Sequence, residues 1–148
     1  RRAPPPPSPQ IFRLEVTLEE LCQGTTKRVR VDLLTREGPR VVRRPTTVEV
    51  TIPRGARGGH CIVVPAGDAG EEVALVLHER PHPRFERSGA DLGTSVRVTL
   101  AEALLGFRRT LRHVDGTDLT VRSPRGVTRP GELLVSRGKG MPRGAGGG

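Results

Sequence analysis

The chain has 148 residues, a formal net charge of +9 at pH 7, 34% hydrophobic residues and only 2% aromatic residues, with no Trp or Tyr. The sequence offers few aromatic side chains on which nucleobases could stack, and its arginines are scattered, so nucleic-acid binding is disfavoured. Acidic protein tails are better candidates for partners of the positive charge. Cys22 and Cys61 are too few and too far apart for a zinc site or a disulfide framework. We therefore expect buried, reduced thiols, no metal and no other cofactor.

The first ten residues form a segment of their own. They read Arg-Arg-Ala-Pro-Pro-Pro-Pro-Ser-Pro-Gln, and such a proline run favours an extended linker, with a ligand for SH3 or WW domains as the alternative. No apolar run along the chain approaches the roughly 18 residues of a membrane-spanning helix. We expect no membrane contact.

A strand and a short helix are predicted next. Apolar and charged residues alternate over Ile11–Val16, which indicates a strand with one buried face. Thr17 and Glu20 have the spacing of a capping box, and Gly24 is suited to end the helix that they begin. The next alternating segment, Lys27–Leu33, is expected to be a strand that pairs with the first.

Short strands separated by turns fill the following stretch. After a turn at residues 36–40, strands are predicted at 41–42, 46–52, 61–64 and 73–77, the last apolar enough to be covered on both faces. Many short strands with turns between them are typical of β-sandwiches.

A joint follows at residues 79–92. Pro81 and Pro83 fix φ and remove backbone donors, so neither a helix nor a central strand can run through them. The joint carries an aromatic side chain, Phe85, which is expected to act as a hydrophobic plug. His82 stands between the two prolines, and we favour a histidine that is hydrogen-bonded to backbone over a catalytic one.

The pattern then repeats. VTLEELCQG at 16–24 aligns with VTLAEALLG at 98–106, and PRG and IVV at 53–55 and 62–64 align with PRG and LLV at 124–126 and 133–135. Strands are predicted in the second copy at 95–100, 108–114, 118–122 and 133–136. Nothing there matches residues 73–77, so the second copy looks truncated. We therefore predict a mostly β chain: a linker at 1–10 and two tandem small β-sandwich modules, each with a short helix, at 11–79 and 80–148.

No residue pattern indicates catalysis. The four histidines lack the spacing of a metal site, and the glycine-rich turns lack the strand-to-helix context of a phosphate loop, so we expect no enzyme. Binding is the remaining function. An apolar groove beside the first strand could accept an extended peptide as an added strand, and the alternative is that Phe12 and Leu14 are simply core residues.

Five motifs in order carry a family resemblance: residues 16–31, PHPRFERSGADL at 81–92, residues 98–106, RPG at 129–131 and GKGMP at 138–142. Together they resemble the C-terminal substrate-binding region of DnaJ/Hsp40 co-chaperones, and the absence of Cys-x-x-Cys-x-Gly-x-Gly repeats makes the chain similar to class B (type II) members. The resemblance implies a groove that binds unfolded or extended client polypeptides. Its lining would be Phe12, Leu14, Val29, Val31 and Phe85.

The resemblance also implies a partner for the positive charge. Lys27 and Arg30 match positions that would bind the acidic C-terminal tail of Hsp70 through charge-assisted contacts. The chain departs from the family pattern in three ways. Val29 stands where a bulkier residue is common, and the sequence contains no His-Pro-Asp motif of a J domain. The family's dimerisation segment is not found either, so the usual homodimer is not expected from this sequence. The alternative function is an Hsp40-like structural subunit of a larger assembly. The expected location is the cytoplasm, with a cilium or axoneme as the alternative.

Overall fold

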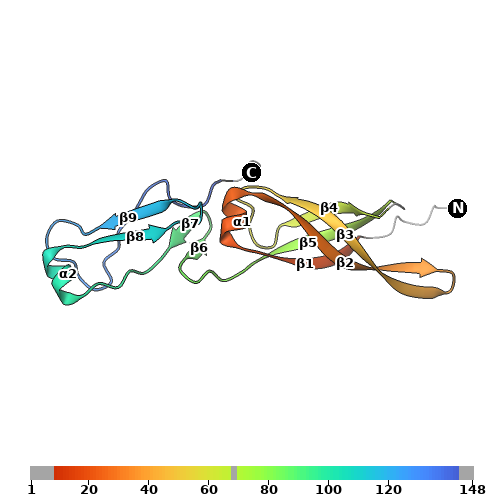
Figure 1. The fold of residues 1–148 in the computed structure, drawn as a ribbon, viewed down its shortest axis with the longest axis horizontal. Helices are drawn as coiled ribbons and strands as arrows, with labels where there is room; N and C mark the ends of the chain where they lie inside the picture. Colours follow the sequence, from red (N-terminus) through yellow and green to blue (C-terminus); the bar gives the residue numbers. More distant parts are fainter. Residues whose placement is uncertain (1–8, 68–69, 144–148) are drawn as a thin grey trace.

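The computed structural model describes residues 9–67 and 70–143 of the chain, so most of the predicted linker lies outside the described residues. Strands dominate, and the described residues contain two short helices, which confirms the predicted mostly β fold. In the first half (residues 9–79) the elements are β1 (Gln10–Val16), α1 (Leu18–Gln23), β2 (Thr25–Glu37), β3 (Arg40–Ile52), β4 (Cys61–Ala66) and β5 (Glu71–Glu79). In the second half (residues 80–143) they are β6 (Glu86–Ser88), β7 (Asp91–Gly93), α2 (Leu100–Leu105), β8 (Arg108–Arg112) and β9 (Asp118–Arg122) (Figure 1).

Two sheets form the first half. In one, β5 is central, parallel to β1 and antiparallel to β4, while in the other β2 and β3 form a long antiparallel ladder. The core lies between them, with Val16 and Leu75 from one sheet meeting Val31 and Val50 from the other. The predicted pairing of the first two strands is wrong, because α1 carries the chain from one sheet to the other (Figure 1).

Helix α1 forms where its caps predict. The Thr17 hydroxyl accepts the N–H of Glu20 at 3.2 Å, which satisfies a donor that the first turn leaves free. Gly24 ends the helix at φ +72°, and a Cβ there would lie 2.9 Å from Cγ of Arg54. The helix buries Leu18 and Leu21, and each such side chain contributes about 1.5–3 kcal/mol of hydrophobic stabilisation.

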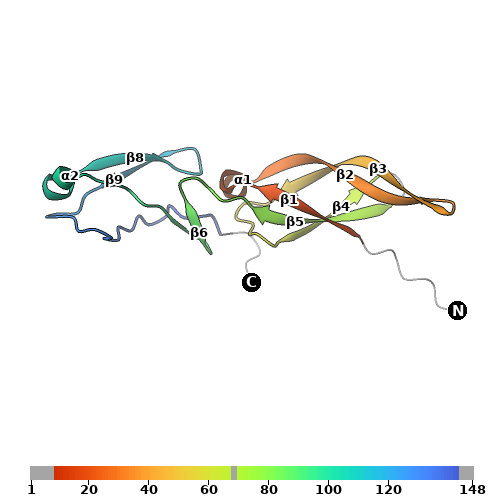
Figure 2. The same ribbon diagram turned by 90° about the horizontal axis from the view of Figure 1, so that it is seen from below.

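The second half consists of small hairpins and extended segments. β6 pairs with β7 and β8 with β9, and the first of these hairpins was not predicted. Residues 95–100 and 133–136 are not strands, contrary to prediction, because a strand needs a hydrogen-bonded neighbour and no described residue supplies one. Figure 2 shows the segment after β9 running back along the second half without regular structure. Within residues 9–67 and 70–143, no helix has the length and apolar character to cross a membrane.

Candidate peptide-binding site

Strand β2 has one open edge. Its other edge pairs with β3, and no described strand pairs with the open one. The side chain of Gln10 closes this edge at one end, because its Nε2 donates to the Leu34 carbonyl at 3.0 Å and its Oε1 accepts the Leu34 N–H at 3.0 Å. Successive residues of an antiparallel ladder direct their N–H and C=O groups to alternate edges. Arg28, Arg30 and Asp32 therefore direct theirs, like Leu34, to the open edge.

Pro45 in β3 supports the same assignment from the partner strand. It lies opposite Asp32 in an unbroken ladder and has no N–H to donate. A proline is compatible with that position only if its nitrogen faces away from β2, which makes Asp32 and Pro45 a pair without mutual hydrogen bonds. This explains why β3 is one strand, where the sequence predicted two pieces on either side of the proline.

The predicted groove residues fall into two groups. Leu14, Val31 and Phe85 are at most 6% exposed and belong to the core, so the expectation that they line an open groove is corrected. Apolar and polar residues alternate along a strand in the same way whether its apolar face packs in a core or lines a groove. The sequence pattern therefore did not distinguish core residues from groove residues. Phe12 and Val29 are partly buried and pack against that core. Their contact with a bound peptide stays a prediction.

The two predicted rim cations differ in their surroundings. Nζ of Lys27 lies 2.9 Å from Oε2 of Glu20, at the beginning of α1, so its charge is already paired. Arg30 is exposed and forms no ion pair with any described residue. An incoming carboxylate would meet Arg30 unpaired but would compete with Glu20 for Lys27.

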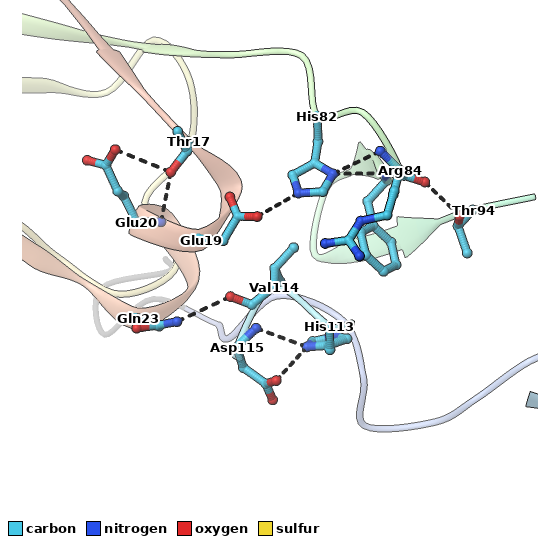
Figure 3. A network of polar contacts seen from close by, with 11 residues as sticks. Thr17, Glu19, Glu20, Gln23, His82, Arg84, Thr94, His113, Val114 and Asp115 are labelled. Carbon is cyan, nitrogen blue, oxygen red and sulfur yellow. Dashed lines mark hydrogen bonds and ion pairs between the residues drawn. The ribbon is translucent and has the colours of Figure 1, made fainter. Parts of the chain in front are cut away.

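A polar network joins α1 to the joint between the halves (Figure 3). Nδ1 of His82 accepts the backbone N–H groups of Arg84 at 3.0 Å and Phe85 at 3.2 Å, which confirms the favoured interpretation of this histidine. Its Nε2 therefore carries the proton and lies 2.6 Å from Oε1 of Glu19. Burial is the largest single influence on the pKa of Glu19 and raises it, but the hydrogen bonds from His82 and the Glu19 backbone and the charges of His82 and Arg84 together lower the pKa below its ordinary value.

The same network reaches the second half. The Phe85 ring lies between the rings of His82 and His113, with centroids 5.5 Å and 6.0 Å away, and the Gln23 side chain donates to the Val114 carbonyl at 3.3 Å. Sequence reasoning missed Glu19 and Gln23, which lie 63 and 91 positions from their partners. Nothing in the local pattern distinguishes them from ordinary helix surface residues.

Among the described residues, no three of the side chains that commonly bind metals lie close enough together to hold an ion. Cys22 is buried and free, as expected, and burial, followed by the charge of Asp115, raises the pKa of its thiol. Cys61 is free but exposed, so the expectation of a buried thiol is wrong there. The arrangement offers backbone groups and partly exposed apolar side chains for binding.

Comparison with known proteins identifies the family. The model of the DnaJ C-terminal domain matches residues 11–148. The chain belongs to the DnaJ C-terminal domain family. Among its relatives, protein psi1 of Schizosaccharomyces pombe is 36% identical over 149 positions, covering 94% of this chain and 38% of that protein. DnaJ homolog subfamily A member 2 of Homo sapiens is 36% identical over 112 positions, covering 70% and 27%.

A bacterial protein is also among the relatives. Chaperone protein DnaJ 2 of Aquifex aeolicus is 39% identical over 104 positions, covering 66% of this chain and 27% of that protein. The chain thus spans between about a quarter and two fifths of the length of these relatives. These matches confirm the family resemblance seen in the sequence motifs, and they place the chain in a family of Hsp40 co-chaperones.

Proposed function

We propose that this DnaJ C-terminal region binds extended segments of non-native polypeptides by adding them as a strand to the open edge of β2. The observation that carries the proposal is the run of outward backbone groups at Arg28, Arg30 and Asp32, between α1 and the Gln10 clasp. Main-chain hydrogen bonds give such a site affinity for many sequences, because every polypeptide backbone carries the same donors and acceptors. Family membership supports the same class of ligand.

The side chains beside the edge supply the apolar part of the proposed site. Phe12 and Val29 keep part of their surface exposed while packing against the core. Apolar side chains of the guest segment would cover that surface, and each Å² removed from water contributes roughly 25 cal/mol. Val29 is small, so the proposed contact is shallow.

An acidic tail is the second proposed ligand. Arg30 is exposed, and Lys27 can exchange the Glu20 carboxylate for one from the tail, so both cations remain available for charge-assisted hydrogen bonds. Under this proposal the partner is the acidic C-terminal tail of Hsp70. Binding would weaken as salt rises, because the contacts lie at the surface.

Three broader features of the proposal follow from the family alone. We propose that residues 11–79 and 80–148 act as two modules in series, that the intact protein works with Hsp70 in the cytoplasm, and that it functions without catalysing a reaction of its own. We also propose the family's homodimer for the intact protein.

Suppression of aggregation tests the main proposal. Phe12→Asp should reduce the ability of the 148-residue chain to keep a chemically denatured client soluble, whereas the control Ile11→Asp, on the neighbouring 74% exposed side chain of the same strand, should not. Thermal unfolding of both variants separates lost binding from lost stability. If the unmodified chain leaves client aggregation unchanged, the proposal is refuted and a structural subunit becomes the better description.

A further inference from the structure

The positive charge of the chain is concentrated in its second half. Residues 80–143 contain 13 Lys and Arg residues against 6 Asp and Glu residues, whereas residues 9–79 contain 10 of each kind. The open edge of β2 and its two cations lie in the first half, so the proposed function leaves this excess unexplained. A charge asymmetry of this kind indicates a partner of opposite charge.

The β8–β9 hairpin presents part of this charge on one face (Figure 1). Apolar side chains from the hairpin, Leu111, Leu119 and Val121, line a cavity of the second half. The residues between them point the other way, because side chains alternate along a strand, and all are exposed. They form the outer face of the hairpin, which consists of Arg108, Thr110, Arg112, Asp118, Thr120 and Arg122.

Two arginines lie directly opposite each other on this outer face. They are Arg108 in β8 and Arg122 in β9. The Ser123 N–H donates to the Phe107 carbonyl at 3.0 Å, so these two neighbours form a hydrogen-bonded pair, and the arginines form the next, non-hydrogen-bonded pair. Opposite side chains approach most closely in pairs of that kind, whose Cα atoms lie roughly 4.5 Å apart.

Among the described residues, no acidic side chain neutralises this arginine pair, because neither Arg108 nor Arg122 forms an ion pair with one. The neighbouring Arg109, on the opposite face of β8, pairs with Glu102 of α2 instead. Like charges directly opposite each other on a sheet are destabilising. The pair therefore opposes folding, and a bound anion would remove the repulsion.

The first half shows that the fold does not require charge at this position. The alignment of the two halves matches Arg108 with Thr26 and Arg122 with Thr51. Thr26 lies opposite Thr51 in the β2–β3 ladder, and their hydroxyl oxygens share a hydrogen bond at 3.3 Å. The same place in the ladder thus holds a neutral pair that satisfies itself in one half and two cations in the other.

The rest of the outer face defines the chemistry of a ligand. Thr110 lies opposite Thr120 in the next row, and Arg112 lies opposite Asp118 in the row after it. A guanidinium binds a carboxylate through two parallel hydrogen bonds, and threonine hydroxyls are donors as well. The rows repeat every two residues, or roughly 6.8 Å, which is also the spacing of alternate side chains in an extended peptide.

Asp118 favours a polypeptide over a nucleic acid or a lipid surface. Its carboxylate forms no ion pair with any residue in the described ranges. It would repel a ligand of continuous negative charge, such as a phosphate backbone or an anionic bilayer, whereas an acidic peptide can place a neutral or basic residue there. The outer face also offers no aromatic ring on which a base could stack.

We propose that the outer face of the β8–β9 hairpin binds an extended, acidic segment of a partner polypeptide. One carboxylate of the segment bridges the guanidinium groups of Arg108 and Arg122, and a second, two positions along, accepts hydrogen bonds from Thr110 and Thr120. The site goes beyond the proposed function, because it uses neither the open edge of β2 nor the cations on that strand.

A fluorophore-labelled peptide of alternating glutamate and serine is the probe, and the same peptide with glutamine for glutamate is the uncharged control. Because Lys27 and Arg30 are a second candidate site for acidic peptides, binding is also measured in the Lys27→Glu, Arg30→Glu chain, where it should persist. In both chains Arg108→Thr combined with Arg122→Thr should weaken binding roughly tenfold or more, since it removes the charge-assisted hydrogen bonds. The glutamine peptide should not bind.

The replacement by threonine also separates binding from folding. It installs the pair that the first half already carries, so the melting temperature should stay the same or rise as the repulsion between Arg108 and Arg122 is removed. The matched control is Arg36→Thr combined with Arg43→Thr, which removes the same charge from two exposed residues of the β2–β3 hairpin. It should change the affinity by less than about twofold.

Three results would overturn the proposal. Unchanged affinity of the Arg108→Thr, Arg122→Thr chain would show that the peptide does not use this face. An equal loss in the Arg36→Thr, Arg43→Thr chain would show that binding follows net charge alone. Binding of a duplex oligonucleotide or of phosphatidylserine vesicles through Arg108 and Arg122, without binding of the peptide, would assign the face to a nucleic acid or a membrane. Suppression of client aggregation reports on β2 separately, so the failure of either proposal leaves the other standing.

Discussion

Replacing Arg30 by proline tests the open edge of β2 directly. The Arg30 N–H points away from β3, so its removal costs no hydrogen bond of the β2–β3 ladder. The chain already contains prolines within antiparallel ladders, such as Pro45 opposite Asp32. Arg30→Pro should therefore fold with a melting temperature close to that of the unmodified chain, while losing one donor at the proposed site.

The expected loss of affinity follows from the bonds affected. One peptide hydrogen bond contributes about 0.5–1.5 kcal/mol net. The proline ring also prevents the guest strand from approaching to the usual spacing of roughly 4.8 Å, so the adjacent bond is weakened too. Together these effects amount to about 1–3 kcal/mol, which corresponds to a roughly 5- to 150-fold increase in the dissociation constant.

Fluorescence anisotropy with a labelled unfolded client fragment measures this change. Arg30→Ala is the matched control, because it removes the same side chain and keeps the N–H. Val31→Pro is a second control, since its N–H belongs to the ladder, and it should destabilise the fold itself. Equal affinity of Arg30→Pro and Arg30→Ala for the fragment would refute the assignment of the guest strand to this edge.

Three further predictions concern charge, pH and backbone conformation. Lys27→Glu combined with Arg30→Glu should abolish binding of an acidic Hsp70 tail peptide in calorimetry, and unaltered affinity would rule out these cations. Because Lys27→Glu also replaces the ion pair with Glu20 by two like charges, the melting temperature should fall by a small amount. The Thr117 hydroxyl and N–H lower the pKa of Asp115 from 3.8 to about 2, so its ionised form stabilises the folded state above about pH 4, and that contribution is lost as the pH falls toward 2. Asp115→Asn should therefore flatten the fall of stability between pH 4 and 2 in denaturation curves, and an unchanged slope would contradict the linkage. Gly24→Ala forces a side chain into φ +72°, which should lower stability by about 1–3 kcal/mol in urea unfolding, and a loss below that range would show that the backbone relaxes.

Local patterns predicted the elements whose causes are local. The capping residues Thr17 and Thr99 placed both helices. Alternation placed β1, and a continuous apolar run placed β5, within two residues of their observed ends. The failures concern pairing. Residues 95–100 alternate as regularly as β1, and residues 133–135 are as apolar as residues 62–64 of β4. A strand also requires a neighbour, and the sequence pattern does not show whether one is present.

For the candidate site, too, the pattern of one strand does not show what lies opposite it. Lys27, Val29 and Arg30 lie on β2, the strand with the open edge, and their contact with a peptide or an acidic tail stays a prediction. Whether an inward side chain such as Val31 is covered depends on the opposite sheet, which the alternation of one strand does not specify. Glu19 contacts the joint at His82 and Gln23 contacts the second half at Val114, both across long separations in sequence, and helix surfaces rich in such residues are common.

The bond between Gln10 and Leu34 has a consequence for the size of a guest. It occupies the outward backbone groups at one end of β2, while α1 stands at the other, so the free stretch runs only from about Thr26 to Asp32. A client docked there would be held by a short window of its length, with both flanks hanging free. Release then needs only a few neighbouring bonds to break, with no threading of the remaining polypeptide.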